Sequence, residues 1–197
     1  MIRGGISVSD SIWNYVTSDE EFVRYLPTMI RSHISASDSS SNRVNRDEAL
    51  SYLNLLLNQP LRDARKFFDT ELYIFGFGET VKELDIHGKE SNVAMYRLHA
   101  QCRFKVIWKN GIKRAGICYE DTPNDEFKEI VHPLLNRKVV RVGLSDKNDL
   151  WLDFKDYWVV FATFENDEES WRFFEYHKKQ HLVATDKVLE LEGGQGD

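Results

Sequence analysis

Over residues 94–106 the even positions are apolar and the odd positions from Arg97 to Lys105 are polar, and this alternation constrains the fold of the chain more than any other feature of its sequence. A period of two is typical of a strand that buries one face and leaves the other polar. The alternation is followed by Asn110-Gly111, the dipeptide that a two-residue type I′ turn prefers because both central residues need positive φ. We therefore predict a β-hairpin over residues 96–120, in which Phe104 faces Ile117.

Further apolar or alternating runs predict that most of the remaining chain is also sheet. The predicted strands lie at residues 67–77, 140–144, 150–154, 158–164 and 170–174, and a closing hairpin lies at 182–191. The two glycines of the string LYIFGFG, residues 72–78, indicate a bulge or a close approach of another backbone. We expect residues 158–164 and 170–174 to pair with each other, and residues 79–92 to form a charged loop.

Helix signals concentrate before the sheet. The spacing of a capping box occurs twice, at Ser18 with Glu21 and at Asn45 with Glu48. Apolar residues at helical spacing follow each box, and the runs are divided at Pro27 and ended before Pro60. A serine-rich loop at residues 35–46 separates them, and a short helix is expected at 126–131. The predicted fold class is therefore α+β, with N-terminal helices followed by mostly antiparallel β-sheet.

The predicted division of the chain is an N-terminal helical segment, residues 1–58, and an antiparallel β-rich domain, residues 59–197, which together form one compact unit. A sequence match at a constant offset of 78 residues leaves two interpretations open. It pairs Leu56-Leu57-Asn58 with Leu134-Leu135-Asn136, and Leu72-Tyr73-Ile74 with Leu150-Trp151-Leu152. The match is either a coincidence of leucine-rich strings or the trace of two related β-meander units.

Composition bounds the function classes. The formal net charge is −6, from 26 basic and 32 acidic residues, which argues against a nucleic-acid partner because phosphate binding draws on a basic field. No apolar run approaches the length of about 20 residues that a membrane span needs, and the N-terminus lacks the apolar centre of a signal peptide. We therefore expect a cytoplasmic protein that binds neither nucleic acid nor membrane.

The two cysteines are expected to be reduced. In the predicted hairpin register, Cys102 and Cys118 project to opposite faces of the sheet. A disulfide needs facing Cβ atoms, so this register does not allow one.

One candidate site for chemistry lies on the polar face of the predicted hairpin. His99, Gln101 and Arg103 share that face, and Glu120 is expected opposite Gln101. In the functional interpretation His99 is a general base and Arg103 holds an anion. In the structural interpretation Glu120 and Arg103 form an ordinary cross-strand ion pair, worth less than about 1 kcal/mol.

Metal and cofactor sites are not expected. His177 and His181 have the spacing of one helical turn, but no further metal ligand accompanies them. The glycines at residues 76–78 lack the third glycine and the following helix of a dinucleotide fingerprint.

A second candidate site is aromatic and lies in the C-terminal third. Trp151, Trp158 and Trp171, together with Arg172, would form an anchor for a protein partner if they were exposed. The alternative is that the tryptophans fill the core.

Two strings carry a resemblance to a family. The chain has LHAQC at residues 98–102 and EESWRFF at residues 168–174. It resembles an uncharacterised family of bacterial proteins with a leucine-histidine-x-glutamine-cysteine strand and a C-terminal glutamate-serine-tryptophan-arginine motif. The chain departs from the family at Phe104 and Lys105, where the family has tryptophan and arginine. It also lacks the glycine-serine-x-aspartate string of the next strand. The resemblance implies no established activity, so it assigns no catalytic residue.

These features favour a non-enzymatic, intracellular protein-binding module. One specific version is an immunity-type antidote whose acidic surface covers a basic toxin. The alternative is a small enzyme or ligand-binding protein that uses the face of His99, Arg103 and Glu120. Self-association through the aromatic strands is a third prediction for the partner.

Overall fold

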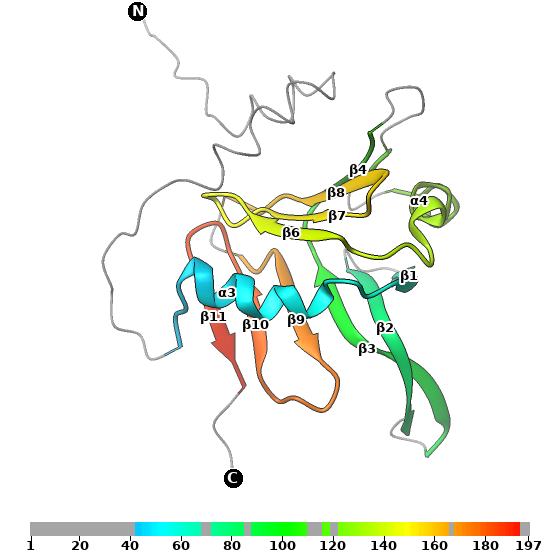
Figure 1. Cartoon of the computed structure of the whole chain (residues 1–197), viewed down its shortest axis with the longest axis horizontal. Helices are drawn as coiled ribbons and strands as arrows, with labels where there is room; N and C mark the ends of the chain where they lie inside the picture. The colour runs from blue at the N-terminus through cyan, green and yellow to red at the C-terminus, as the bar shows by residue number, and fades with distance from the viewer. Residues whose placement is uncertain are drawn as a thin grey trace, which may run out of the picture.

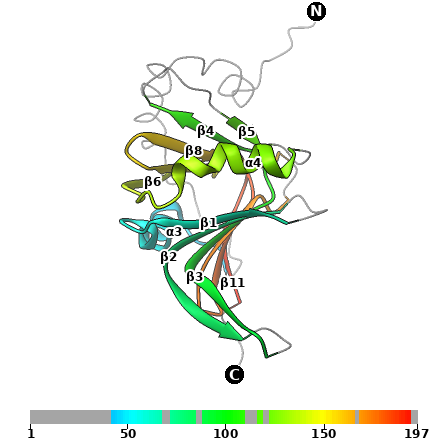
Figure 2. The same cartoon turned by 90° about the vertical axis from the view of Figure 1, so that its right-hand side faces the viewer.

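The computed structural model describes residues 42–67, 72–84, 88–109, 116–118, 122–165 and 168–193, with Ile117 described by its backbone alone. The molecule is built from two antiparallel sheets that face each other, with two short helices packed beside them (Figures 1 and 2). The prediction of a mostly antiparallel sheet is confirmed. The helix predicted before residue 35 lies outside the described residues. No described helix has the length and apolarity to cross a bilayer.

The larger sheet has six strands. Their spatial order is β1 (Leu61–Lys66), β2 (Tyr73–Leu84), β3 (Glu90–Ala100), β9 (Trp171–Glu175), β10 (His181–Ala184) and β11 (Leu189–Glu192). The first three strands and the last three come from distant parts of the chain, and they join where β3 pairs with β9.

The smaller sheet has five strands. Their spatial order is β5 (Gly116–Cys118), β4 (Phe104–Trp108), β8 (Tyr157–Phe161), β7 (Leu150–Asp153) and β6 (Arg141–Leu144). Two helical segments, each an α-helix followed by a 3-10 turn, flank the sheets: α3 (Arg46–Leu53) with η1 (Asn54–Leu56), and α4 (Asn124–Val131) with η2 (His132–Leu134). Helix α3 packs beside β6, and α4 packs beside β1 and β5.

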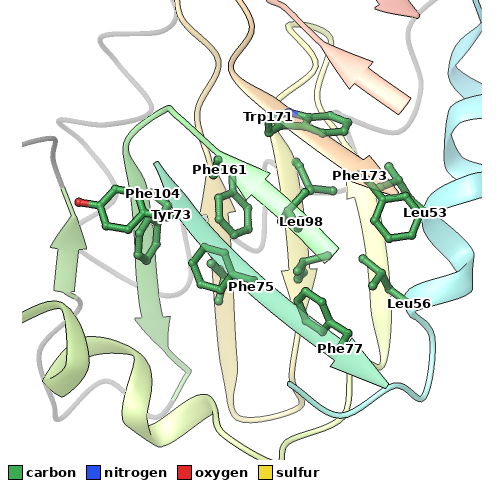
Figure 3. Packing of buried hydrophobic residues seen from close by; sticks show 14 of the residues in the cluster. Leu53, Leu56, Tyr73, Phe75, Phe77, Leu98, Phe104, Phe161, Trp171 and Phe173 are labelled. Carbon is green, nitrogen blue, oxygen red and sulfur yellow. The ribbon is translucent and has the colours of Figure 1, made fainter. Parts of the chain in front are cut away.

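One aromatic core fills the space between the sheets. Phe75 of β2 meets Phe104 of β4 and Phe161 of β8 edge to face, with ring centroids 5.2 and 5.1 Å apart (Figure 3). Leu53 and Leu56 from the first helical segment are fully buried in the same core. Edge-to-face rings add about 0.5–1.5 kcal/mol per pair beyond their area burial, so this cluster is the main link between the sheets.

The capping box before α3 is confirmed in both directions. The side chain of Asn45 accepts from the Glu48 amide at 3.0 Å, and the Glu48 carboxylate accepts from the Asn45 amide at 3.0 Å. These bonds satisfy amides that have no partner within the helix. The short helix expected at 126–131 is also confirmed as α4.

The predicted continuous strand over residues 94–106 is wrong, because β3 and β4 belong to different sheets. Between them the amides of Gln101 and Cys102 both donate to the carbonyl of Ser170, which turns the chain from one sheet to the other. The alternation of burial continues in phase across this turn, with Cys102 and Phe104 both buried. The sequence pattern therefore contains no sign of the break.

The pairing of β4 with β5 confirms an antiparallel hairpin but shifts its register by one residue. Phe104 lies opposite Cys118 and not opposite Ile117. The predicted turn at residues 110–111 lies outside the described residues. The register argument against a disulfide was wrong, although both Cys102 and Cys118 are free and buried.

Two further predictions are corrected. Residues 79–84 and 90–92 are not a loop: β2 and β3 pair from Thr80 opposite Ala94 to Leu84 opposite Glu90, so these residues form a two-stranded arm (Figure 2). The predicted bulge is confirmed between Phe77 and Thr80, where Gly78 has a φ of 83°. Strand β9 does not pair with β8, because it lies in the other sheet between β3 and β10.

His181 lies on strand β10 and His177 lies in the preceding turn with a φ of 68°, so the helical spacing considered for them does not exist. The closing hairpin predicted at 182–191 is confirmed as β10 and β11. Its turn is held by the amide of Thr185, which donates to the carbonyl of Val188.

The offset of 78 residues recurs in the structure of the helical segments. Helix α3 and η1 correspond to α4 and η2 residue by residue, and Asn58 and Asn136 both have a φ of 64°. The amide of Asn58 donates to the carbonyl of Val139 at 2.8 Å, and the amide of Asn136 donates to the carbonyl of Leu61 at 2.7 Å. These bonds relate the two segments by an approximate two-fold axis.

The strand part of the same match is out of step. Ala64 pairs with Phe75 in the first unit, and Val142 pairs with Leu152 in the second. Ala64 and Val142 are 78 residues apart, but the residues that they face, Phe75 and Leu152, are only 77 residues apart. The change of one residue reverses which side of the sheet a matched side chain occupies.

Candidate functional site

The residues of the first predicted site are separated. His99 lies near the end of β3 and points to the outer face of the six-stranded sheet, opposite to its buried neighbours Leu98 and Ala100. Arg103 lies in the crossing segment after β3, where its carbonyl accepts from the amide of Ala162 at 3.0 Å. Glu120 lies outside the described residues. His99 and Arg103 therefore do not share one strand face.

The residues of the second predicted site are also divided. Trp171 is fully buried in the core, and its indole N–H donates to the carbonyl of Asn148 at 2.9 Å. Trp151 and Trp158 lie on the outer face of the five-stranded sheet. Arg172 lies on the outer face of the six-stranded sheet, directly opposite His99. Residues from the two predicted sites thus meet at one cross-strand pair.

We call the outer face of the six-stranded sheet the Arg172 face. Cross-strand registers place its residues in two rows from β1 to β11: Asp63, Gly76, Arg97, Phe174, His181 and Glu192; and Arg65, Ile74, His99, Arg172, Val183 and Glu190. Neighbours within a row have Cβ atoms about 4.5–5.5 Å apart, so they interact directly.

Arg172 is the centre of the ionic contacts on this face. Its guanidinium donates to both carboxylate oxygens of Glu169, at 3.0 and 2.6 Å, and to the Glu192 carboxylate at 3.0 Å. A further nitrogen of the guanidinium lies 3.2 Å from Nδ1 of His181. The hydrogen bonds that Arg172 donates to Glu169 raise the pKa of Arg172 further. The arginine is held in one orientation by its bidentate partner.

His99 extends this arrangement as a neutral ring. It packs edge to face on Phe174 with centroids 4.7 Å apart, and Phe174 lies 4.8 Å from the ring of His181. Burial, followed by the charges of Arg97 and Arg172, lowers the pKa of His99 to about 4. Its Nε2 atom is buried and has no hydrogen-bond partner in the described part of the chain. A group with this pKa is a weak base at neutral pH.

Charge on the face continues into the arm. Arg97 donates to the carboxylate of Glu83 at 3.0 Å, so β3 is tied to the end of β2. At the other end, Arg43 lies 3.8 Å from Glu190 on β11. The ion pairs of this surface run from the arm to the edge strand.

The outer face of the five-stranded sheet has a different centre. Asp153 is 1% exposed and accepts from the side chains of Lys109 and Arg141 and from the amide of Lys155. Burial acts to raise the pKa of Asp153, but the hydrogen bonds from Lys109 and Arg141 outweigh it and lower the pKa overall. The ammonium group of Lys109 also lies over the ring of Trp158, 4.8 Å from its centroid.

Two other kinds of chemistry would depend on the cysteines or on metal-ligating side chains. Burial raises the pKa of the Cys118 thiol to about 12 and raises that of Cys102 as well, so neither forms a thiolate nucleophile at neutral pH. Across the described ranges no cluster of three or more histidine, cysteine, aspartate or glutamate side chains is arranged to hold a metal ion.

The partners of Arg172 were missed at the sequence level, although one signal was available. Glu169 and Arg172 belong to the same distinctive string, ESWRF, and the short separation between them lets the two side chains meet. The roles of Glu192 and Phe174 depend on which strands become neighbours, and no local pattern indicates them.

Comparison with known proteins gives no family assignment: no family model, curated protein or solved structure matches this chain. The resemblance carried by residues 98–102 and 168–174 therefore stays a prediction.

Proposed function

We propose that the protein is a cytoplasmic, non-enzymatic binding module of the immunity type, which covers a basic toxin with its Arg172 face. The observation that carries the proposal is the network in which Glu169 and Glu192 hold Arg172 beside an aromatic row. Arginine and aromatic side chains are enriched among the residues that dominate binding energy at protein interfaces.

Preorganisation supports this use of the face. Arg172 has a long side chain, and ordering such a side chain on binding costs about 0.5–1.5 kcal/mol. Here the ordering occurs on folding, because the carboxylate of Glu169 accepts two hydrogen bonds from one edge of the guanidinium. Phe174 and the flanking histidines are likewise held between neighbouring strands.

Charge at the edge of the face supports a basic partner. The side chains of Glu190 and Glu192 are 34% and 44% exposed, so a partner can reach them while they keep their contacts with arginine. The chain as a whole carries a net charge of −6. Opposite charge on a partner accelerates encounter and favours the correct orientation, and salt weakens both effects.

The test uses the tagged full-length chain to capture proteins from a lysate of its own host, at low and high salt, with mass spectrometry and native mass as readouts. The wild type is compared with the double variant Glu190→Lys/Glu192→Lys. A matched control, Glu126→Lys/Glu129→Lys, makes the same charge change on the exposed side of α4. We expect a stoichiometric basic protein that is retained by the wild type and the control and is lost with the face variant.

Two results would remove the support for this proposal. One is a protein that elutes alone at both salt concentrations. The other is a partner that the face variant and the α4 control retain equally, because the contact would then lie elsewhere.

A further inference from the structure

The outer face of the five-stranded sheet combines apolar and charged residues in two rows. From β4 to β6 the rows are Lys105, Val160, Trp151 and Gly143; and Ile107, Trp158, Asp153 and Arg141. We call this surface the tryptophan face. Its indole rings lie flat enough to cover the sheet: a Cβ on Gly143 would stand only 2.0 Å from the ring of Trp151.

The apolar centre of this face is buried although it points away from the core. Ile107, Trp151 and Trp158 are 6%, 7% and 4% exposed. Ile107 and Trp158 form an apolar cluster with Val160 that is separate from the main core. The buried apolar residues of α3 and α4 join the core on the opposite side of the sheet. Among the described elements, none accounts for the burial of this cluster.

The polar groups of the face also indicate that the described residues do not account for everything that covers it. The indole N–H of Trp151 is buried and has no acceptor among the residues that the structure describes. A buried donor without an acceptor costs about 1–3 kcal/mol, so such groups are rare in a complete structure. Burial also lowers the pKa of the Lys105 ammonium group, which is unusual for a lysine on the outside of a sheet.

The chain holds a segment of suitable chemistry. Forty-one residues precede Asn42, the first described residue. After the capping-box spacing of Ser18 and Glu21, an apolar stripe follows at helical spacing: Phe22, Tyr25, Leu26, Met29 and Ile30. A short amphipathic helix is stable mainly when its apolar stripe packs on another surface.

The charge of the N-terminal segment and the length of the residues that follow it both fit docking on the tryptophan face. Acidic residues Asp19, Glu20 and Glu21 open the stripe, and the face carries Lys105, Lys109 and Arg141. The serine-rich residues 35–41 span up to about 25 Å when extended. A five-stranded sheet is about 19 Å wide from first to last strand. Asn42 accepts from the amide of Leu191 at the β11 edge of the other sheet. Stacked sheets lie about 10 Å apart, so the linker is long enough to bring the segment from Asn42 onto the tryptophan face.

We propose that residues 18–34 of the same chain dock on the tryptophan face as an amphipathic helical segment, divided at Pro27, with their apolar stripe against Trp151, Trp158 and Ile107. The segment makes a third layer of the molecule outside the five-stranded sheet. It leaves the Arg172 face on the other sheet free for a partner, so this inference is independent of the proposed function.

The test reads both sides of the contact in the full-length protein by hydrogen exchange and by the indole N–H signals in NMR spectra. The segment variant is Leu26→Asp/Ile30→Asp. The matched control is Leu84→Asp on the arm, where the wild-type leucine is 65% exposed. We expect exchange at the Trp151 indole and in β7 and β8 to rise by about tenfold or more in the segment variant and to stay unchanged in the control.

A second variant, on the tryptophan face, distinguishes loss of docking from local unfolding of the sheet. Trp158→Ala should raise exchange in residues 18–34, while the core amides of β2 and β3 stay protected and show that the sandwich is folded. The proposal is overturned if residues 18–34 exchange as an unfolded chain does in the wild type. It is also overturned if the Trp151 indole stays protected in the segment variant, or if its protection depends on protein concentration with a dimeric native mass. The last outcome would identify a second copy as the occupant.

Discussion

The two outer faces of this molecule have the same geometry and opposite chemistry. Each is a set of side chains that alternate with core residues on antiparallel strands. On the Arg172 face, arginine is paired with two partly exposed carboxylates and water reaches much of the network. On the tryptophan face, the carboxylate of Asp153 is almost inaccessible and Trp158 lies opposite it on the neighbouring strand. The comparison shows that the outward side of a strand does not by itself indicate contact with solvent.

The difference in exposure determines how much an ion pair on each face contributes to stability. An ion pair screened by water contributes about 0–1 kcal/mol, whereas removal of one member of a buried pair costs about 3–5 kcal/mol. Substitutions on the tryptophan face should therefore affect stability more than equivalent substitutions on the Arg172 face.

The largest effect is expected for Asp153→Ala. This change removes the acceptor shared by Lys109, Arg141 and the amide of Lys155, and we expect the free energy of unfolding to fall by about 3 kcal/mol. Urea denaturation measures the loss. The control is Asp156→Ala, whose pair with Arg137 is exposed on both sides and should cost less than about 1 kcal/mol. Equal losses for the two variants would contradict the contrast between buried and exposed pairs.

A smaller effect is expected for Gly143→Ala. The added methyl group would collide with the ring of Trp151, so the indole must move off the strand. Overpacking of this kind costs about 1–3 kcal/mol. The near-ultraviolet circular dichroism of the tryptophans should change together with the midpoint of urea denaturation. An unchanged spectrum with full stability would show that the ring does not lie over this glycine.

Arg172→Lys tests the other face with its charge conserved. Lysine cannot donate to both oxygens of Glu169 in the planar geometry of a guanidinium, so we expect a loss of about 1 kcal/mol. Partner capture should weaken in the same variant. Arg43→Gln, at the exposed edge of the same face, should leave stability within about 0.5 kcal/mol of the wild type. A larger loss of stability for Arg43→Gln than for Arg172→Lys would show that Arg172 is not the centre of the network.

The titration of His99 has no effect on stability at neutral pH and is expected to lower stability only in acid. Its pKa is lowered in the folded protein to about 4, against about 6.5 for an unperturbed histidine. The unfolded chain therefore binds a proton first, and the stability contributed by the neutral ring is present above about pH 6.5 and is lost as the pH falls to about 4. His99→Gln should flatten the fall in unfolding free energy over this window. An NMR titration of His99 with a midpoint near 6.5 would contradict the assignment.

Local features of this protein were predictable because their energies are local. The capping box of Asn45 and Glu48, helix α4 and the β10–β11 hairpin each depend on residues close in sequence. Alternating burial around Leu98 was predicted for the same reason, since a strand exposes successive side chains to opposite sides.

The candidate site was predictable only in part. His99 and Arg172 were each identified as candidates, but they were assigned to different sites because 73 positions separate them in the chain. The pairing of β3 with β9 joins them. The tryptophans show the converse error: Trp171 shares a string with Arg172, yet the alternation of a strand sends it into the core.

By itself, the sequence determined several local features, namely the cap of α3, helix α4 and the β10–β11 hairpin, because neighbouring residues decide these features through side-chain alternation and local hydrogen bonds. Only the tertiary structure decided that the chain crosses between sheets at Gln101 and Cys102 and that β9 lies beside β3. Such choices depend on the burial that distant strands achieve together, and a register change of one residue leaves the local pattern intact while reversing every face.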